Sequence, residues 1–564
     1  MSKQKSAIYI QAFEVGPDCY SISIESLLII YVYGACESEY INLRLQLVKS
    51  PLDVSVKLDG SPLKYSIIDN DLPKLSTYCS WPIIIVENNV IAGVSAVARQ
   101  IIKQSKNENV QHLLGFRGSC LMACSEVSVW TMFCEIDMPQ GLKQILKSLT
   151  SDNSERIIIP KCISRFEFHL KQPVRVHNMY KVARLSNKKI STDIPKNELN
   201  LEHKYAEGPT MTISDMILYP CVDIFFKLFD THDLQEKFPL TYDWYKNMQK
   251  ESGQQVDVVL SLGSNQLDIS IDDNFIKQSL YKSDMSHYKI EKKAYTKQAN
   301  IERGLEIISL SNIEVLNSNS LYGADIEFNW ENIPPELNPC GGSLPEKRAD
   351  RKCEQLESMV KPAMKIVGDS IFTIVDFCSG SGHLGLLLAY LLPKCHVILV
   401  ENKEKSLQRA TERIEILNLL NVTVVQSNLD YFCADFQLGV SLHACGTATD
   451  LVMQMCVKNQ ANFVCCPCCY GGIKKCHLLD FPRSQSFSTL KQLTYKDYLS
   501  LAHGADQTHD NENAKTKQGY LCMDIIDTDR KLYAESFHYT VLLGKLQPFT
   551  CTNKNNVIVG IKNI

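Results

Sequence analysis

The sequence predicts an α/β protein of several domains, with a parallel, doubly wound sheet in its C-terminal part. An apolar strand at 371–376 runs directly into a glycine-rich loop and an apolar helix at 386–392. Further apolar segments with the composition of buried strands follow at 396–400, 422–426, 436–443 and 461–466. The 564 residues exceed one compact domain, because a domain typically has roughly 100–200 residues.

Strands and one helix are expected in residues 1–105. Apolar residues at near-alternating positions favour strands at 7–13, 20–33 and 41–48. A hairpin follows, with a turn at Asn88-Asn89 between short strands at 83–86 and 90–91. Ser95 then opens an amphipathic helix, whose first turn its hydroxyl can cap.

Helices dominate the prediction for residues 106–255. Thr212 precedes Asp215 by three residues, the spacing of a capping box, and an apolar run follows at 216–226. The region ends near Trp244-Tyr245. A polar connector is expected over 256–330.

The last domain is predicted over 331–564. It opens with a helix at 346–360, on which basic residues share one face and suit phosphate contacts or simply face solvent. These residues are Lys347, Arg348, Arg351 and Lys352. After a polar insertion at 484–517, the segments 523–528 and 537–543 are expected to add a final pair of strands. The sheet would then have seven strands.

The glycine-rich loop gives the strongest functional signal. Gly380, Gly382 and Gly385 fit the G-x-G-x-x-G spacing between a strand and a helix, which lets a nucleotide approach the backbone. The next strand ends in Glu401, whose two oxygens are placed to accept both ribose hydroxyls of a nucleoside. This pattern alone fits either a dinucleotide or S-adenosylmethionine.

Two residues discriminate between these ligands. Asp376 ends the first strand directly before the loop, as is usual in S-adenosylmethionine-dependent methyltransferases. Asn428 follows the third strand, where that class commonly reads adenine, and its amide oxygen can accept from the adenine amino group. S-adenosylmethionine is therefore the predicted cofactor, and its predicted ligands are Asp376, Cys378, Gly380, Gly382, Glu401 and Asn428.

The ends of the fourth and fifth strands are expected to line the acceptor side, because ligands bind beyond the carboxyl ends of parallel strands. His443 stands at the first of these ends, where it can deprotonate or position a nucleophile, or hydrogen-bond to the neighbouring loop. Cys468 and Tyr470 stand at the second end. Together with His443 they are the predicted catalytic residues.

The cysteines near these strand ends leave three hypotheses open. The fifth strand and its loop contribute thiols at 465, 466, 468 and 469. They can bind zinc with help from Cys445 and His443, although adjacent cysteine pairs are too cramped for all four to reach one ion. A thiolate can instead add to a pyrimidine ring, or small semi-apolar side chains can simply pack a tight loop. Packing is preferred, so no metal is predicted.

Charge and cysteine content bound the class of protein. The net charge of −4 excludes a histone-like basic protein. No signal-peptide pattern opens the sequence, and the apolar run at 20–34 contains Glu25 and falls short of the roughly 20 residues that span a bilayer. With 22 cysteines, a reduced cytoplasmic protein is expected.

The front half resembles glutathione transferases. The resemblance rests on Pro82 before the third strand, Ser95 at the helix start, the Thr212 capping box and the terminal Trp244-Tyr245. It implies a thioredoxin-like domain at 1–105, with a cis Pro82, and an all-α glutathione transferase C-terminal-like domain at 106–255. No glutathione-activating residue follows the first strand, so glutathione transferase activity is not expected.

Over nearly its whole length the chain resembles the glutathione S-transferase C-terminal domain-containing proteins. The motifs that carry the resemblance are DFCSG at 376–380, LHACG at 442–446 and CCPCCYG at 465–471. It implies a Rossmann-like methyltransferase domain and a cytoplasmic location. Related domains occur in tRNA ribose methyltransferases, so RNA (tRNA or rRNA) is the favoured acceptor. The alternative is a non-catalytic scaffold whose front half binds a protein partner or forms a dimer.

Overall fold

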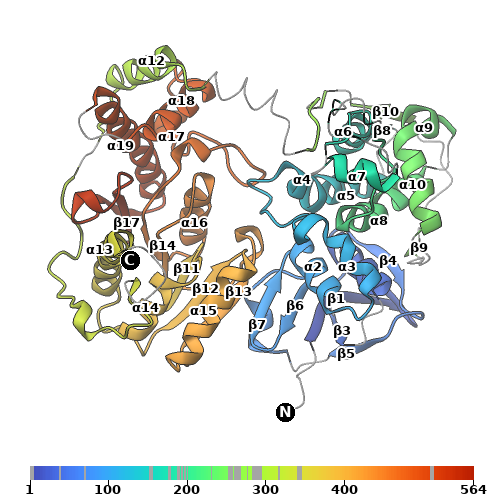
Figure 1. Cartoon of the computed structure of the whole chain (residues 1–564), viewed down its shortest axis with the longest axis horizontal. Coiled ribbons are helices and arrows are strands. Elements are labelled where there is room, and N and C mark those ends of the chain that lie inside the picture. Colours follow the sequence, from blue (N-terminus) through green and yellow to red (C-terminus); the bar gives the residue numbers. More distant parts are fainter. Residues whose placement is uncertain are drawn as a thin grey trace. The chain divides into compact units, whose positions relative to one another are not determined.

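The computed structural model divides into two compact units, which are described separately (Figure 1). The first contains Met1–Met285 with Tyr431–Cys433, and the second contains Ser286–Asp430 and Ala434–Ile564. The structure describes residues 6–36, 40–68, 72–150, 156–175, 179–186, 201–229, 232–251, 258–259, 268–272, 274–275, 277–281, 295–315, 318–339, 346–508 and 513–563, with single positions at 191, 193, 195 and 199.

The sheet of the first unit is built around one long strand, β1. β1 pairs in parallel with β3 and antiparallel with β6, and β6 forms the expected hairpin with β7. The second half of β1 pairs with β2, β2 pairs with β4, and β4 pairs with β9. The strands of this unit are β1 (Ser6–Gly16), β2 (Cys19–Ile22), β3 (Ile41–Leu47), β4 (Val56–Asp59), β5 (Tyr65–Ile68), β6 (Ile83–Val86), β7 (Asn89–Ala92), β8 (Arg156–Ile159), β9 (Val258–Val259) and β10 (Asp268–Ile271).

Helices account for most of the rest of this unit. They are α1 (Ile24–Ala35), α2 (Val94–Gln104), α3 (Glu108–Gln111), α4 (Val129–Met132), α5 (Met138–Thr150), α6 (Lys161–Leu170), α7 (Met179–Ser186), α8 (Ile213–Leu228), α9 (His232–Lys237) and α10 (Pro239–Glu251). The predicted capping box opens α8, where the Thr212 amide donates to Asp215 over 2.8 Å. The buried Asp215 also accepts from the Trp244 indole over 2.9 Å, which ties α10 to α8.

Two predictions in this unit are wrong in detail. The second half of the strand predicted at 20–33 is α1, capped by the Ser23 hydroxyl. This helix is apolar on all sides because it is buried, so its sequence lacks the periodicity that separates a helix from a strand. α2 begins at Val94, and Ser95 lies inside it with a buried hydroxyl that has no partner among the described residues, so Ser95 does not cap. The Trp81-Pro82 peptide bond is cis.

The second unit contains the predicted seven-stranded sheet. Its strand order is β16-β17-β15-β14-β11-β12-β13. The five strands from β11 to β15 are parallel, whereas β17 and β16 run antiparallel to their neighbours. The strands are β11 (Thr373–Phe377), β12 (His396–Glu401), β13 (Val422–Gln426), β14 (Leu438–Ser441), β15 (Asn462–Cys465), β16 (Tyr539–Lys545) and β17 (Asn556–Lys562). β12 and β14 lie on opposite sides of β11, so the strand order reverses at β11. A ligand is therefore expected at the carboxyl end of β11.

Helices connect and flank these strands. They are α12 (Gln298–Ser309), α13 (Glu346–Val367), α14 (His383–Leu391), α15 (Glu404–Ile416), α16 (Thr447–Lys458), α17 (Gln485–Ser488), α18 (Tyr495–Ala505) and α19 (Ala514–Glu535). The apolar face of α13 is buried, with Leu356 and Val360 in the same core cluster as Leu386 of α14. Within the region predicted as a connector, α12 packs on α18 through Gly304 and Leu501.

The C-terminal segment differs from its prediction. Residues 523–528, expected as a strand, lie in the middle of α19, and the antiparallel pair consists of β16 and β17 instead. The predicted polar insertion at 484–517 contains α17, α18 and the start of α19. Asp524, Asp527 and Asp529 of α19 are buried, and each has a partner, as in the 3.0 Å contact of Asp524 with the Lys545 amine. Within the described part of the chain, no helix is long and apolar enough to span a membrane.

Candidate functional site

The glycine loop is held between β11 and α14 by a buried carboxylate. Asp376 is 2% exposed, and its Oδ2 accepts a hydrogen bond of 2.8 Å from the Gly385 amide. A Cβ at Gly385 would lie 3.0 Å from Asp376 and 2.3 Å from Leu399, so strand and helix approach this closely only because residue 385 is glycine. Burial raises the pKa of Asp376 to about 7, while the Gly385 hydrogen bond and the charge of Lys352 oppose that rise.

The loop itself has left-handed backbone at three positions. Cys378, Gly380 and Gly382 have φ angles of 55°, 57° and 77°, a region that costs roughly 1–2 kcal/mol for a residue with a side chain. A Cβ added at Gly380 would meet no atom within 4 Å, so the loop borders open space there. The hydroxyl of Ser379 is buried and has no hydrogen-bond partner among the described residues.

Glu401 and Asn428 lie at the ends of the next two strands. The Glu401 carboxylate accepts from the amide of Gly380 through Oε2 and from the amides of Asn402 and Lys403 through Oε1, each over 2.9 Å. Asn402 also donates to the Asn428 side-chain oxygen over 3.2 Å. The structure therefore brings Asn428, Glu401 and the glycine loop together along one edge of the sheet.

The structure corrects the prediction for Lys352. Lys347, Arg348 and Arg351 are exposed on α13, whereas the Lys352 amine lies within hydrogen-bonding distance of His443 Nε2. One step along a helix turns the side chain by about 100°, which takes Lys352 off the face of Arg351. Burial lowers the pKa of Lys352 to about 8, while the charge of Asp376 acts to raise it.

His443 lies at the end of β14, on the acceptor side of the expected pocket. Surrounding protein atoms desolvate its imidazole and lower its pKa to about 4, and the charge of Lys352 adds to this shift, although part of the residue stays exposed. The ring is neutral at neutral pH, so its Nε2 can accept a hydrogen bond from Lys352.

Tyr470 is placed differently from its prediction. It is fully buried, and its hydroxyl donates to Asp527 over 2.7 Å. Its amide donates to Asp506 over 3.1 Å. The side chain and the amide of Tyr470 therefore both anchor the loop to buried or partly buried carboxylates.

A buried ion network behind this loop was missing from the predictions. The Arg530 guanidinium binds both oxygens of Asp450 over 3.1 and 2.7 Å, and it contacts Asp527 over 3.0 Å. The guanidinium carbon of Arg530 lies 5.4 Å from the centre of the Tyr470 ring. The signal in the sequence was the three-residue spacing of Asp527 and Arg530, which marks one face of a helix, but this segment was expected to be a strand.

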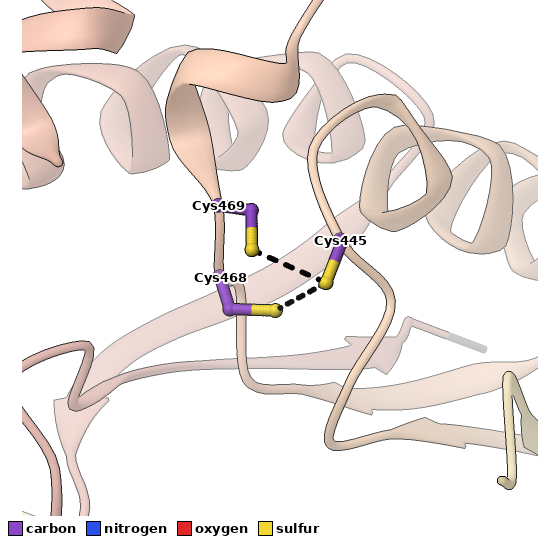
Figure 2. A group of neighbouring side chains, drawn as sticks. All are labelled: Cys445, Cys468 and Cys469. Atoms are coloured by element: carbon purple, nitrogen blue, oxygen red, sulfur yellow. Dashed lines mark hydrogen bonds between the residues drawn. The ribbon is translucent and has the colours of Figure 1, made fainter. Parts of the chain in front are cut away.

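The cysteines separate into two groups. Cys465 and Cys466 are buried, whereas the sulfurs of Cys445, Cys468 and Cys469 converge (Figure 2). Cys445 Sγ lies 3.2 Å from Cys468 Sγ and 3.3 Å from Cys469 Sγ. Interactions with the Cys445 and Cys468 thiols lower the pKa of the Cys469 thiol. Cys468, the predicted catalytic thiol, is thus one member of a cluster of three.

Comparisons with known proteins agree with this organisation. Residues 350–476 match a family model described as a methyltransferase domain, a range that includes the glycine loop and the three converging cysteines. The solved structure of magnesium protoporphyrin IX methyltransferase from Synechocystis PCC 6803, with bound SAM, aligns over 42% of this chain and 93% of its own at 11% identity. Its TM-score of 0.25 is too low to support a conclusion about this chain.

Relatives match over nearly the whole length. The glutathione S-transferase C-terminal domain-containing protein homolog of Drosophila melanogaster is 37% identical over 575 residues, which cover 95% of both chains. The human glutathione S-transferase C-terminal domain-containing protein is 30% identical, and the match covers 94% of both chains. The chain belongs to the family of glutathione S-transferase C-terminal domain-containing proteins.

Proposed function

We propose that this protein is an S-adenosylmethionine-dependent methyltransferase whose cofactor lies against the glycine loop between β11 and α14. One observation carries the proposal: Asp376, Gly380 and Glu401 meet at the carboxyl ends of two adjacent parallel strands, where α/β sheets bind ligands. The methyltransferase family match over 350–476 supports the same assignment.

The residues at this edge fit the cofactor. The open space at Gly380 leaves room for a ligand close to the backbone, and the buried Ser379 hydroxyl offers a donor without a partner among the described residues. Two carboxylate oxygens provide about four acceptor positions, and the described amides use three of those on Glu401. Acceptor capacity is therefore left for a ribose hydroxyl.

Each residue then has a separate task. When bound, S-adenosylmethionine supplies an electrophilic methyl group. Glu401 would hold the ribose and Asn428 the adenine amino group, while Asp376 keeps the loop in place through Gly385. His443 and Lys352 would position the acceptor, and this alignment contributes much of the rate in an in-line displacement.

Transfer of a labelled methyl group tests the activity. Wild-type protein, Glu401→Gln and the control Lys405→Gln, which changes an exposed residue of α15, are incubated with tritiated S-adenosylmethionine and cell extract. We expect label in macromolecules with wild type and the control, and at least a tenfold loss with Glu401→Gln, since a hydrogen bond to a charged group contributes about 1.5–3 kcal/mol. Equal labelling by all three proteins contradicts the proposed site.

We propose RNA, either tRNA or rRNA, as the acceptor. Lys347, Arg348 and Arg351 are exposed at the start of α13, and basic side chains of this kind bind phosphate groups. The labelled product should therefore be sensitive to ribonuclease and resistant to protease. Label found only in protein contradicts the choice of RNA. Cofactor binding without any labelled product favours the scaffold alternative.

For the first unit we propose a thioredoxin-like domain at 1–105, followed by a helical domain that resembles the C-terminal part of glutathione transferases. The order of β3, β1, β6 and β7 and the capping box of α8 support this proposal. A cytoplasmic location is proposed as well, because the cysteines in the described part of the chain form no disulfide and thiols persist in reducing compartments.

A further inference from the structure

Three thiols meet at the carboxyl ends of β14 and β15, and they come from two different loops. Cys445 follows β14, while Cys468 and Cys469 follow the adjacent parallel strand β15. Figure 2 shows the three side chains directed toward one another, with Cys445 on one loop facing Cys468 and Cys469 on the other. One ligand atom from each lies within 4.8 Å of the others, and Cys445 and Cys469 are exposed.

The backbone is shaped to bring two consecutive cysteines to one point. Successive side chains of an extended chain point in opposite directions, which would separate Cys468 from Cys469. Cys469 instead has φ 50° and ψ 50°, in the left-handed region. That conformation costs roughly 1–2 kcal/mol for a residue with a side chain, and strain of this kind concentrates at functional sites.

The two loops are also locked side by side. Cys445 and Cys468 form an isolated parallel bridge, and the Gly446 amide donates to the Cys468 carbonyl over 2.9 Å. A Cβ at Gly446 would lie 2.6 Å from the Gly472 carbonyl carbon, so only glycine permits this approach. Asp506 holds the far side of the second loop through the amides of Tyr470 and Gly471.

The neighbouring thiols do not belong to the group. Cys465 and Cys466 are buried, and the Cys466 sulfur lies 3.6 Å from the Lys554 carbonyl oxygen. The cramped four-cysteine arrangement considered from the sequence is therefore replaced by a set of three from two loops. Three protein ligands with an exposed fourth direction are typical of zinc sites that bind an exchangeable ligand.

We propose that Cys445, Cys468 and Cys469 bind one zinc ion as thiolates, with the fourth coordination position open to solvent or to an added ligand. Sulfur donors select soft cations such as Zn²⁺. A Zn–S bond of about 2.3 Å in tetrahedral geometry separates two sulfurs by about 3.8 Å, so the 3.2 and 3.3 Å separations need to widen by only about half an ångström. This site goes beyond the proposed methyl transfer and does not rest on it.

Cobalt serves as the probe, because Co²⁺ occupies tetrahedral thiolate sites and gives an intense thiolate-to-metal absorption band. Reduced, metal-free full-length protein is titrated with Co²⁺ and then with Zn²⁺. We expect one equivalent of Co²⁺ with a tetrahedral spectrum, displaced by one equivalent of Zn²⁺. The variants Cys445→Ser, Cys468→Ser and Cys469→Ser should each weaken binding roughly 100-fold or more, since even the loss of an outer-shell partner costs 10–100-fold.

Two controls make the result specific. Cys476→Ser changes a partly exposed thiol of the same unit outside the cluster and should bind Co²⁺ like wild type. Circular dichroism of the metal-free variants should match that of metal-free wild type, which shows that each variant is folded. Binding that survives in the three single variants, or wild-type protein that binds no Co²⁺ while its thiols are reduced, overturns the site.

Calorimetry with S-adenosylmethionine separates this proposal from the methyltransferase assignment. Glu401→Gln should lose affinity for S-adenosylmethionine and keep the cobalt spectrum, whereas Cys469→Ser should lose the spectrum and keep the affinity. A protein that binds cobalt but not S-adenosylmethionine contradicts only the cofactor assignment. A protein that binds S-adenosylmethionine but not cobalt contradicts only the metal site.

Discussion

The two sides of one sheet edge contain different kinds of residues. At the ends of β11 and β12, glycines and carboxylates hold a loop through backbone amides, as in the contacts of Asp376 with Gly385 and of Glu401 with Gly380. At the ends of β14 and β15, the Gly446 amide joins the two loops through the Cys468 carbonyl, three thiols converge, and the Arg530 ion network lies next to Tyr470. We propose the first side for a nucleoside and the second for a metal ion, so one edge would serve two kinds of ligand.

The largest effect on stability is expected from loss of the buried Arg530 ion network. Arg530→Leu leaves Asp450 and Asp527 buried without their cation. Removing one partner of a buried ion pair costs about 3–5 kcal/mol, so the free energy of unfolding measured with urea should fall by that amount. Arg409→Leu, at an exposed position of α15, should change it by less than about 0.5 kcal/mol. Similar values for both variants would show that the network does not support this side.

A smaller, pH-dependent effect is expected at the glycine loop. Burial raises the pKa of Asp376 to about 7, well above the unfolded value of about 3.9. Between these values the folded state keeps a proton that the unfolded state releases, so this residue lowers stability as pH rises toward 7. Asp376→Asn does not titrate in this range. The free energy of unfolding of Asp376→Asn minus that of wild type should therefore increase by on the order of 2 kcal/mol between pH 5 and 7.5.

Urea unfolding at several pH values checks the sign at Asp376. The matched control is Asp435→Asn, which changes an exposed carboxylate in the same unit. The difference in free energy of unfolding between Asp435→Asn and wild type should be the same at every pH. If the Asp376→Asn difference is equally level or shrinks as pH rises, then Asp376 is not desolvated and the contrast between the two sides of the edge weakens.

The smallest effect concerns the acceptor. Neutralising Lys347, Arg348 and Arg351 to glutamine should reduce the dependence of RNA affinity on salt by roughly one unit of logarithmic slope for each residue that contacts a phosphate. Fluorescence anisotropy with labelled tRNA over a range of salt concentrations measures that slope. The control is Lys405→Gln, at an exposed position on α15. An unchanged slope in the triple variant would remove α13 from any RNA contact.

The sequence predicted one side of this edge better than the other for a physical reason. The glycine loop is local: strand, loop and helix follow one another within 373–391, so spacing alone indicates the arrangement. Six of the seven predicted strands are present, whereas the segment 523–528 is helical and β17 takes its place in the sheet. The cysteine cluster joins residues 445 and 468, which lie far apart in the chain and meet only because β14 and β15 are neighbours.

Burial explains the remaining errors. α1 is apolar on all sides, and α19 buries acidic residues that are paired with Arg530 and Lys545, so neither shows the usual periodicity of a surface helix. Lys352 and Tyr470 were assigned by their position in the sequence, yet helix rotation and the contact with Asp527 decide where these side chains lie. Tertiary partners of this kind leave no mark in a local pattern.

Calorimetric titration of the full-length protein with S-adenosylmethionine tests most directly whether the glycine loop binds this cofactor. We predict one binding event per chain for wild type, and a 10- to 100-fold weaker affinity for Glu401→Gln, which corresponds to about 1.4–2.8 kcal/mol. The control Lys405→Gln should bind like wild type. No heat of binding with wild type, or equal affinities for wild type and Glu401→Gln, would contradict the account.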